Sequence, residues 1–263
     1  MEKIVCGKMN QTKTPDQLYF TMQAEIGITK HMGGKQATKK LIELCNIKEN
    51  SFVLDVGCGT GKTACFLAEK IGCKVFGIDL YEGMIKQAKE RAKRKKIKGI
   101  EFSAANAEQL PFKDNTFDAV ISESVVGFFK DKQKGLNEFA RVTKPNGFIG
   151  INELTWTGNP EQKITDSMKN LMGAEFNDFK GWKKLMENSG LKEIQVTEFK
   201  PNALKQFFDE ISWMELRDFF LPWIKVVLLI IKSKEYRNYI KGMAKTPLNV
   251  SKYMGYGIYS GRK

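Results

Sequence analysis

The stretch Ser51–Thr63 reads SFVLDVGCGTGKT and carries the pattern that decides the fold. Its apolar start, FVL, is typical of a buried parallel strand, and an aspartate closes that run. The alternating glycines Gly57, Gly59 and Gly61 then allow a tight turn and a close approach of the backbone to a ligand. Residues 63–71 have a helical pattern, so the loop stands at a helix N-terminus, which favours an anionic or strongly polar ligand group. The stretch therefore predicts a nucleotide-type site.

Two common glycine loops are excluded by their spacing. A phosphate-binding P-loop needs a glycine five residues before its Gly-Lys pair, and Val56 stands there. The dinucleotide fingerprint needs a glycine at its sixth position, which is Lys62 here. What remains is an acidic residue, Asp55, followed by three alternating glycines. This pattern resembles motif I of the class I S-adenosylmethionine-dependent methyltransferases.

Two later stretches carry further cofactor contacts of that family. Residues 74–80 (KVFGIDL) read as a second strand, and its Asp79 stands about twenty residues past the glycine loop, where an acid accepts hydrogen bonds from a ribose diol. Residues 105–112 (ANAEQLPF) resemble the family's D-A-E-x-L-P-F stretch, whose acid accepts a bond from the adenine amino group. Asn106 replaces that acid, and its amide oxygen can still accept, as a weaker, neutral contact.

The remaining stretches predict the rest of a sheet. Residues 117–122 (FDAVIS) match a fourth strand, and residues 141–147 (RVTKPNG) resemble the family's R-V-L-K-P-G-G turn into a fifth strand at 148–154. A sixth strand at 191–199 alternates apolar and polar residues, and 253–262 reads as the last. We therefore predict an α/β fold with a doubly wound, mostly parallel seven-stranded sheet and helical additions.

This fold is expected to form a single domain over the 263 residues, whose 42% hydrophobic content can fill one large core. Its expected parts are an N-terminal helical lid, a cofactor-binding core, a helical cap insertion and the last strand. They cover residues 1–46, 47–200, 201–252 and 253–263 in that order.

Composition narrows the class of protein. Five cysteines without a CxxC pair, an odd count, and no signal peptide predict a reduced, cytoplasmic protein. A single histidine and the lack of a Cys/His cluster argue against a metal site. The net charge of +13 favours anionic partners or an anionic membrane surface. Much of this charge lies in residues 86–98, which have no interleaved aromatic residues and so read as a solvated helix face rather than a nucleic-acid site.

The resemblance implies S-adenosylmethionine as cofactor and S-adenosylhomocysteine as product. Methyl transfer from a sulfonium is an in-line displacement, so the enzyme mainly aligns the reactants and excludes water. A base is needed only when the acceptor must lose a proton. The expected cofactor contacts are Asp55, Gly57, Cys58, Gly59, Gly61, Asp79, Leu80, Asn106, Ala107 and Ser122.

Three polar residues are candidates for facing the acceptor, namely His31, Glu123 and Glu153. His31 is the side chain best suited to take a proton near neutral pH, and both glutamates lie near the carboxyl ends of strands, where open α/β sheets bind ligands. Each has an alternative interpretation. His31 reads equally as a turn residue, Glu123 as a helix-capping acid, and Glu153 as a contact to the cofactor's amino group or to a basic neighbour.

Two helical segments are candidates for closing the acceptor pocket. Residues 15–28 carry apolar side chains at helical spacing and precede a Gly33-Gly34 break, so they read either as a hinged lid or as a plain packing helix. Residues 219–234 are an apolar run with flanking lysines, which is too short to span a bilayer. It could cap the pocket, pack against the core or lie in an anionic membrane interface, and a cap is the preferred interpretation.

The pattern as a whole resembles the small-molecule branch that includes quinone, sterol and tocopherol methyltransferases. This resemblance implies methyl transfer to a small, partly apolar acceptor, with peripheral contact to an anionic membrane as a further hypothesis. One alternative is a methyltransferase acting on RNA or protein, which the net charge supports. The Asn-Pro-Pro-aromatic motif of enzymes that methylate a flipped base is absent at Asn159-Pro160-Glu161, however. Another alternative is a regulatory protein that binds the cofactor without turnover.

Overall fold

The computed structural model describes residues 13–27, 29–200, 216–243 and 248–263. The described residues form a seven-stranded sheet in the order β3-β2-β1-β4-β5-β7-β6. Pairs from β3 to β5 are parallel, and β7 is antiparallel to both β5 and β6. The predicted doubly wound, mostly parallel seven-stranded sheet is confirmed. The strands are β1 (Phe52–Val56), β2 (Lys74–Asp79), β3 (Ile100–Ala104), β4 (Phe117–Glu123), β5 (Thr143–Trp156), β6 (Lys192–Phe199) and β7 (Met254–Arg262).

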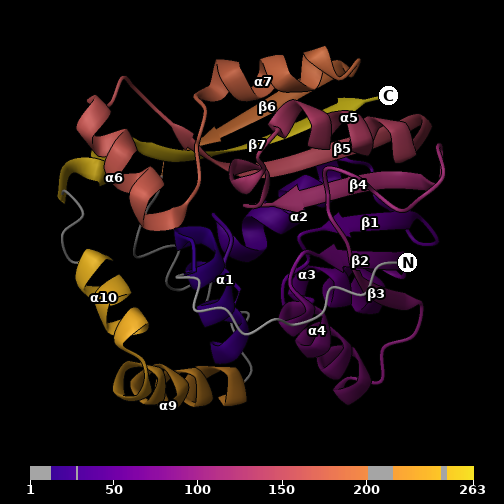
Figure 1. Ribbon diagram of the computed structural model, residues 1–263. Helices are drawn as coiled ribbons and strands as arrows, with labels where there is room; N and C mark the ends of the chain where they lie inside the picture. Colours follow the sequence, from indigo (N-terminus) through magenta and orange to yellow (C-terminus); the bar gives the residue numbers. More distant parts are fainter. Residues whose placement is uncertain (1–12, 28, 201–215, 244–247) are drawn as a thin grey trace.

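Helices cover both faces of the sheet (Figure 1). Adjacent residues of a strand point to opposite faces, so Val53 of β1 joins a core with α2, α3 and α4, whereas Leu54 joins a core with α5 and α7. Both residues are fully buried, which explains the continuous apolar run in the sequence. The helices are α1 (Pro15–Ile26), α2 (Gly34–Leu44), α3 (Lys62–Phe66), η1 (Leu67–Ile71), α4 (Glu82–Arg94), η2 (Val126–Phe128), α5 (Lys132–Val142), α6 (Gln162–Met172), α7 (Phe179–Asn188), α9 (Leu216–Lys232), α10 (Lys234–Met243) and η3 (Leu248–Lys252).

Four helices, α1, α6, α9 and α10, form a separate layer beside the carboxyl ends of the parallel strands (Figure 1). Helix α9 packs against α1 and α10, and Lys225 Nζ donates to the Ile26 carbonyl at 3.3 Å. The Tyr236 hydroxyl of α10 donates to Glu25 at 3.2 Å. No helix in the described part of the chain is long and apolar enough to cross a membrane.

The fifth strand extends beyond its predicted end at residue 154. β5 continues to Trp156 because β7 pairs with it from Phe148 onward, with Met254 opposite Trp156. Glu153 therefore lies inside a buried strand rather than at its end. Residues 201–215, the first part of the expected helical cap insertion, lie outside the described residues.

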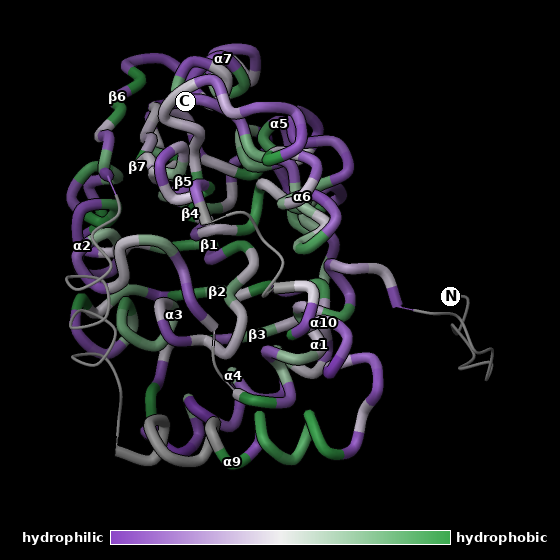
Figure 2. Tube along the Cα trace, turned by 90° about the vertical axis from the view of Figure 1, so that its left-hand side faces the viewer, coloured by the Kyte–Doolittle hydropathy of each residue, from purple (hydrophilic) through white to green (hydrophobic). Residues whose placement is uncertain are grey.

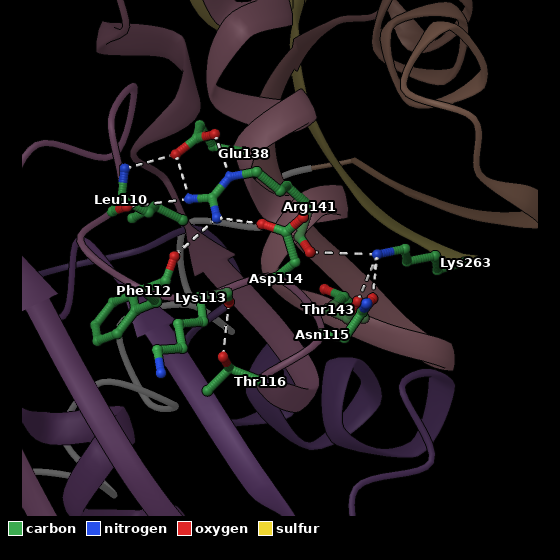
Figure 3. A network of polar contacts seen from close by, with 10 residues as sticks. All are labelled: Leu110, Phe112, Lys113, Asp114, Asn115, Thr116, Glu138, Arg141, Thr143 and Lys263. Carbon is green, nitrogen blue, oxygen red and sulfur yellow. Dashed lines mark hydrogen bonds and ion pairs between the residues drawn. The ribbon is translucent and has the colours of Figure 1, made fainter.

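Arg141 at the end of α5 holds the loop that enters β4 (Figure 3). Its guanidinium donates to the carbonyls of Leu110 and Phe112, at 3.0 and 2.7 Å, and to the carboxylates of Glu138 and Asp114. This network lies at the amino end of β4, whereas the glycine loop lies at the carboxyl end of the neighbouring β1. We infer a structural role for it.

We expect Arg141→Ala to lower the free energy of unfolding by about 1–3 kcal/mol, because the carboxylates of Glu138 and Asp114 and two carbonyls each lose the hydrogen bonds that the guanidinium donates. Urea denaturation measures the change. The matched control is Lys184→Ala, which removes a long cationic side chain from the exposed face of α7 and should change stability by less than ~0.5 kcal/mol. Equal destabilisation by both variants would contradict the structural role of the network.

Candidate active site

A cavity of about 340 Å³ opens at the carboxyl ends of the parallel strands. Its wall includes Gly57 after β1, Asp79 at the end of β2, Ala105 after β3 and Glu123 at the end of β4. The strand order changes direction between β1 and β4, because β2 and β3 follow on one side of β1 and β4 and β5 on the other, and open α/β sheets bind ligands at such a point. Its volume lies in the range of small-molecule sites.

The glycine loop forms part of this wall with its backbone. Gly57 and Gly59 line the cavity with φ values of 71° and 53°, the left-handed region in which a side chain is strained. A Cβ at Gly57 would come within 2.4 Å of Val125, and one at Gly59 within 2.5 Å of Thr29. The loop is therefore packed so closely that only glycine fits at these two positions.

Asp79 presents a buried carboxylate beside that loop. Its Oδ2 accepts from the Gly59 N–H and its Oδ1 from the Tyr81 N–H, both at 2.9 Å. Burial raises the pKa of Asp79 to about 6, although these backbone donors partly oppose the shift. Each oxygen keeps a lone pair for a further donor. The neighbouring Leu80 lines the cavity with an exposed apolar side chain, which suits a flat ring.

The other predicted cofactor contacts divide into two groups. Asn106 and Ala107 line the cavity, and Asn106 Oδ1 accepts from the Glu108 N–H at 2.9 Å, which leaves one lone pair on that oxygen. The second group does not line the cavity and consists of Asp55, Cys58, Gly61 and Ser122. Asp55 is buried at the end of β1, and burial raises the pKa of its carboxyl, while a bond from the Ala64 N–H of α3 lowers it. This bond joins β1 to α3 across the loop.

Glu123 brings a second buried carboxyl to the cavity. Its Oε2 lies 3.0 Å from His31 Nε2 and accepts from Thr38 Oγ1 at 2.9 Å. Its Oε1 is buried and has no hydrogen-bond partner among the described residues. Burial raises the pKa of Glu123 to about 8, and the Thr38 bond opposes this only in part. His31 does not line the cavity itself but lies against the carboxyl that does.

Glu153 does not line the cavity and lies three residues before the end of β5. Its Oε1 accepts from the backbone N–H groups of Val125 and Val126, at 2.9 and 2.8 Å. Burial raises the pKa of Glu153 to about 7, with these donors opposing the shift. The geometry thus connects Glu153 to the loop after β4, which carries Phe128 into the cavity wall.

Three aromatic rings also line the cavity, one of them from the N-terminal segment. Phe20 of α1 lies with its ring centroid 4.6 Å from Phe128 and 5.2 Å from Tyr81, and all three rings line the cavity. The segment behind α1 is held in place, because the Asn152 side chain donates to the Met32 carbonyl at 2.8 Å. Helix α1 therefore forms one side of the cavity, while no described residue of α9 or α10 lines it.

Sequence reasoning missed several residues of this site. Tyr81 and Phe128 follow strands β2 and β4 and line the cavity. Their positions just past the strand ends could have predicted this. Arg91, on the inner face of α4, donates from Nε to the Thr60 carbonyl of the glycine loop at 3.0 Å. It belongs to a basic run that reads as a solvated face, and only the structure shows that it is buried.

Comparison with known proteins agrees with this geometry. A family described as a methyltransferase domain matches residues 54–151, which run from β1 to β5 and include the glycine loop. An uncharacterized protein of Haemophilus influenzae is 32% identical over 187 residues, covering 69% of this chain and 74% of that protein. The chain belongs to the class I S-adenosylmethionine-dependent methyltransferases. The predicted family is confirmed.

Other members of the methyltransferase family are more distant or longer. Phosphoethanolamine N-methyltransferase 1 of Zea mays is 31% identical over 163 residues, 62% of this chain, and the match spans about a third (32%) of the maize enzyme. The structure of Haemonchus contortus phosphoethanolamine N-methyltransferase 2 with S-adenosyl-L-methionine has a TM-score of 0.72. It covers 93% of this chain and 56% of that one at 19% identity, which shows a shared fold.

S-adenosylmethionine is the cofactor that the family implies, and the Haemonchus contortus enzyme holds it in its structure. The cavity residues fit it on three points of their own. Asp79 offers carboxylate lone pairs at the end of β2, the glycine loop offers bare backbone, and Leu80 offers an exposed apolar surface. These are the groups that a ribose diol, a polar chain and an adenine ring require.

Proposed function

We propose that this methyltransferase transfers a methyl group to a small, partly apolar acceptor that binds beside Glu123. One observation carries the proposal: the residues that fit the cofactor share a single cavity with Phe20, Phe128 and Glu123. Aromatic rings with one polar group among them are typical of a site for a small molecule. The name of the maize relative, phosphoethanolamine N-methyltransferase, supports a small acceptor as well.

Different residues bind the cofactor, exclude water and accept a proton in such a transfer. The bound cofactor supplies a methyl group already activated on a sulfonium, ready for in-line displacement. Asp79, Asn106 and the glycine loop hold the cofactor side, and Phe20 of α1 helps to exclude water from the acceptor side. Where the acceptor must lose a proton, Glu123 Oε1 is the atom that receives it. His31 then acts through Glu123 as a positioning residue, because its Nε2 lies 3.0 Å from the other oxygen of that carboxyl, Oε2, and His31 does not line the cavity.

A label-transfer assay tests the proposal. Radiolabelled S-adenosylmethionine and the protein are incubated with extract that has been fractionated into lipid-soluble, polar-metabolite and macromolecular pools. We expect label in one of the two small-molecule pools. Label in macromolecules would instead indicate an RNA or protein methyltransferase, and cofactor binding without any transfer would indicate a regulatory protein.

We also propose a reduced, cytoplasmic setting for this reaction, with peripheral contact to an anionic membrane. The described cysteines support the first part, since Cys45, Cys58, Cys65 and Cys73 are all buried free thiols. The second part rests on the exposed apolar side chains of α9.

A further inference from the structure

The outer face of α9 carries a row of exposed apolar side chains. The row consists of Ile224, Val227, Leu228 and Ile231, which are 57%, 53%, 45% and 67% exposed. Their i, i+3, i+4, i+7 spacing puts them on one face of the helix. Among the described residues, Leu80 in the cavity wall is the one other exposed large hydrophobic side chain. Figure 2 shows the hydrophobic colouring of α9 at the lower edge of the molecule.

The opposite face of α9 already attaches the helix to the protein. Val226, Leu229 and Ile230 are half-buried on that side. Lys225 reaches the end of α1 from there and donates to the Ile26 carbonyl. The helix is therefore apolar on both faces, whereas a surface helix of a globular protein ordinarily turns a polar face to water. Packing within the described chain does not account for the outer row.

Positive charge borders this row at its C-terminal end. Lys232, Lys234, Arg237 and Lys241 are exposed there, with Glu235 as the one exposed carboxylate of this stretch. Arg237 donates from one nitrogen to the carbonyls of Ile230 and Ile231, at 2.8 and 2.9 Å, so its guanidinium lies directly beside the end of the row. An apolar stripe edged by lysine and arginine is complementary to the acyl boundary and anionic headgroups of a bilayer.

We propose that α9 lies in the interface of an anionic bilayer, with its outer row inserted among the lipid headgroups. This inference goes beyond methyl transfer and concerns where the enzyme works. Helix α1 contacts α9 on one side and supplies Phe20 to the cavity. Docking through α9 therefore places the acceptor end of the cavity one helix away from the membrane.

Vesicle flotation tests the proposal with the full chain. We expect the protein to float with phosphatidylcholine vesicles that contain about 30 mol% phosphatidylglycerol and to remain behind with phosphatidylcholine alone. Ile224→Ser/Leu228→Ser should lower the partition coefficient by about 10–100-fold, because it removes half of the apolar row.

Charge-reversal variants test whether vesicle binding depends on the basic residues beside the α9 row or only on the net charge of the protein. Lys232→Glu/Lys234→Glu should also weaken flotation. Lys180→Glu/Lys184→Glu changes the net charge equally on the exposed face of α7 and should float like the wild type. Flotation equal for the α9 variants and the wild type, or an equal loss in the α7 control, would overturn the proposal.

Two readouts complete the test. Wild-type protein that floats with neither vesicle overturns the proposal, and a dimer that Ile224→Ser/Leu228→Ser dissociates would then assign the row to a second copy of the chain. Calorimetric binding of S-adenosylhomocysteine should be unchanged in all of these variants, because no described α9 residue lines the cavity. A failure of docking is thereby distinguished from a failure of the proposed function.

Discussion

With an acceptor that loses a proton on methylation, Glu123→Gln should lower turnover by ~10²–10⁴-fold, the typical contribution of a general base. The reason is geometric: Glu123 lines the cavity, its buried Oε1 has no hydrogen-bond partner among the described residues, and an amide at that place cannot take a proton from the acceptor. Affinity for S-adenosylhomocysteine should stay within about threefold, because Asp79 and the glycine loop are untouched. Initial rates of label transfer measure turnover, and calorimetry measures the affinity for S-adenosylhomocysteine.

His31→Ala should also lower turnover while cofactor affinity holds, because His31 Nε2 contacts Glu123 Oε2 at 3.0 Å. The matched control is Glu187→Gln, which neutralises an exposed carboxylate on α7 and should react like the wild type. If His31 only shapes the segment that closes the cavity, cofactor affinity should fall together with the rate. Wild-type turnover in Glu123→Gln would rule out Glu123 as the base.

The pH profile provides a second check on Glu123. Burial raises the pKa of this carboxyl to about 8, so it is mostly protonated at pH 7 and mostly ionised at pH 9. Only the ionised form accepts a proton, and turnover should therefore rise with pH across that range. Its charged neighbours are Asp55 and Lys62, with His31 in direct contact. The Glu123→Gln variant should show no such rise.

Asp79→Ala should weaken S-adenosylhomocysteine binding by about 1–3 kcal/mol, the value of hydrogen bonds to a charged group. Its carboxylate lies at the end of β2 with a lone pair left on each oxygen, and the variant removes both. Calorimetry measures the loss, with Glu82→Ala as control, since Glu82 is an exposed acid three residues further on. Equal affinity of Asp79→Ala and the wild type would contradict the ribose role.

Cofactor binding should also weaken as the pH falls through about 6. Burial raises the pKa of Asp79 to about that value, so its carboxyl gains a proton there in the free protein. A ribose hydroxyl donates best to the ionised carboxylate, and binding therefore favours the ionised form. Affinity should be constant above pH 7 and decline below 6, and Asp79→Ala should abolish this dependence.

The cofactor side of the site could be predicted from the sequence because its determinants are local. The glycine loop, Asp79 and Asn106 each follow a strand directly, and a parallel sheet gathers such positions at one edge. The backbone conformation of Asn146 is also determined locally. It replaces a glycine of the family's turn and adopts a φ of 65°, the left-handed region that asparagine tolerates.

The acceptor side depends on contacts between distant parts of the chain, which periodicity and spacing do not encode. Glu153 is buried because β7 pairs with β5 about a hundred residues later in the chain. His31 lies against Glu123 because Asn152 and Ser124 hold the segment around Met32. The sequence allows residues 15–28 to form either a lid or a packing helix. The structure places α1 in the cavity wall through Phe20.

Calorimetric titration of the wild-type protein tests the central claim, that this cavity holds S-adenosylmethionine and not another nucleotide. S-adenosylhomocysteine, NAD and ATP are titrated in parallel under one set of conditions. We predict one molecule of S-adenosylhomocysteine bound per chain, and no measurable heat of binding for NAD or ATP. Tight binding of NAD or ATP, with no binding of S-adenosylhomocysteine, would contradict the account.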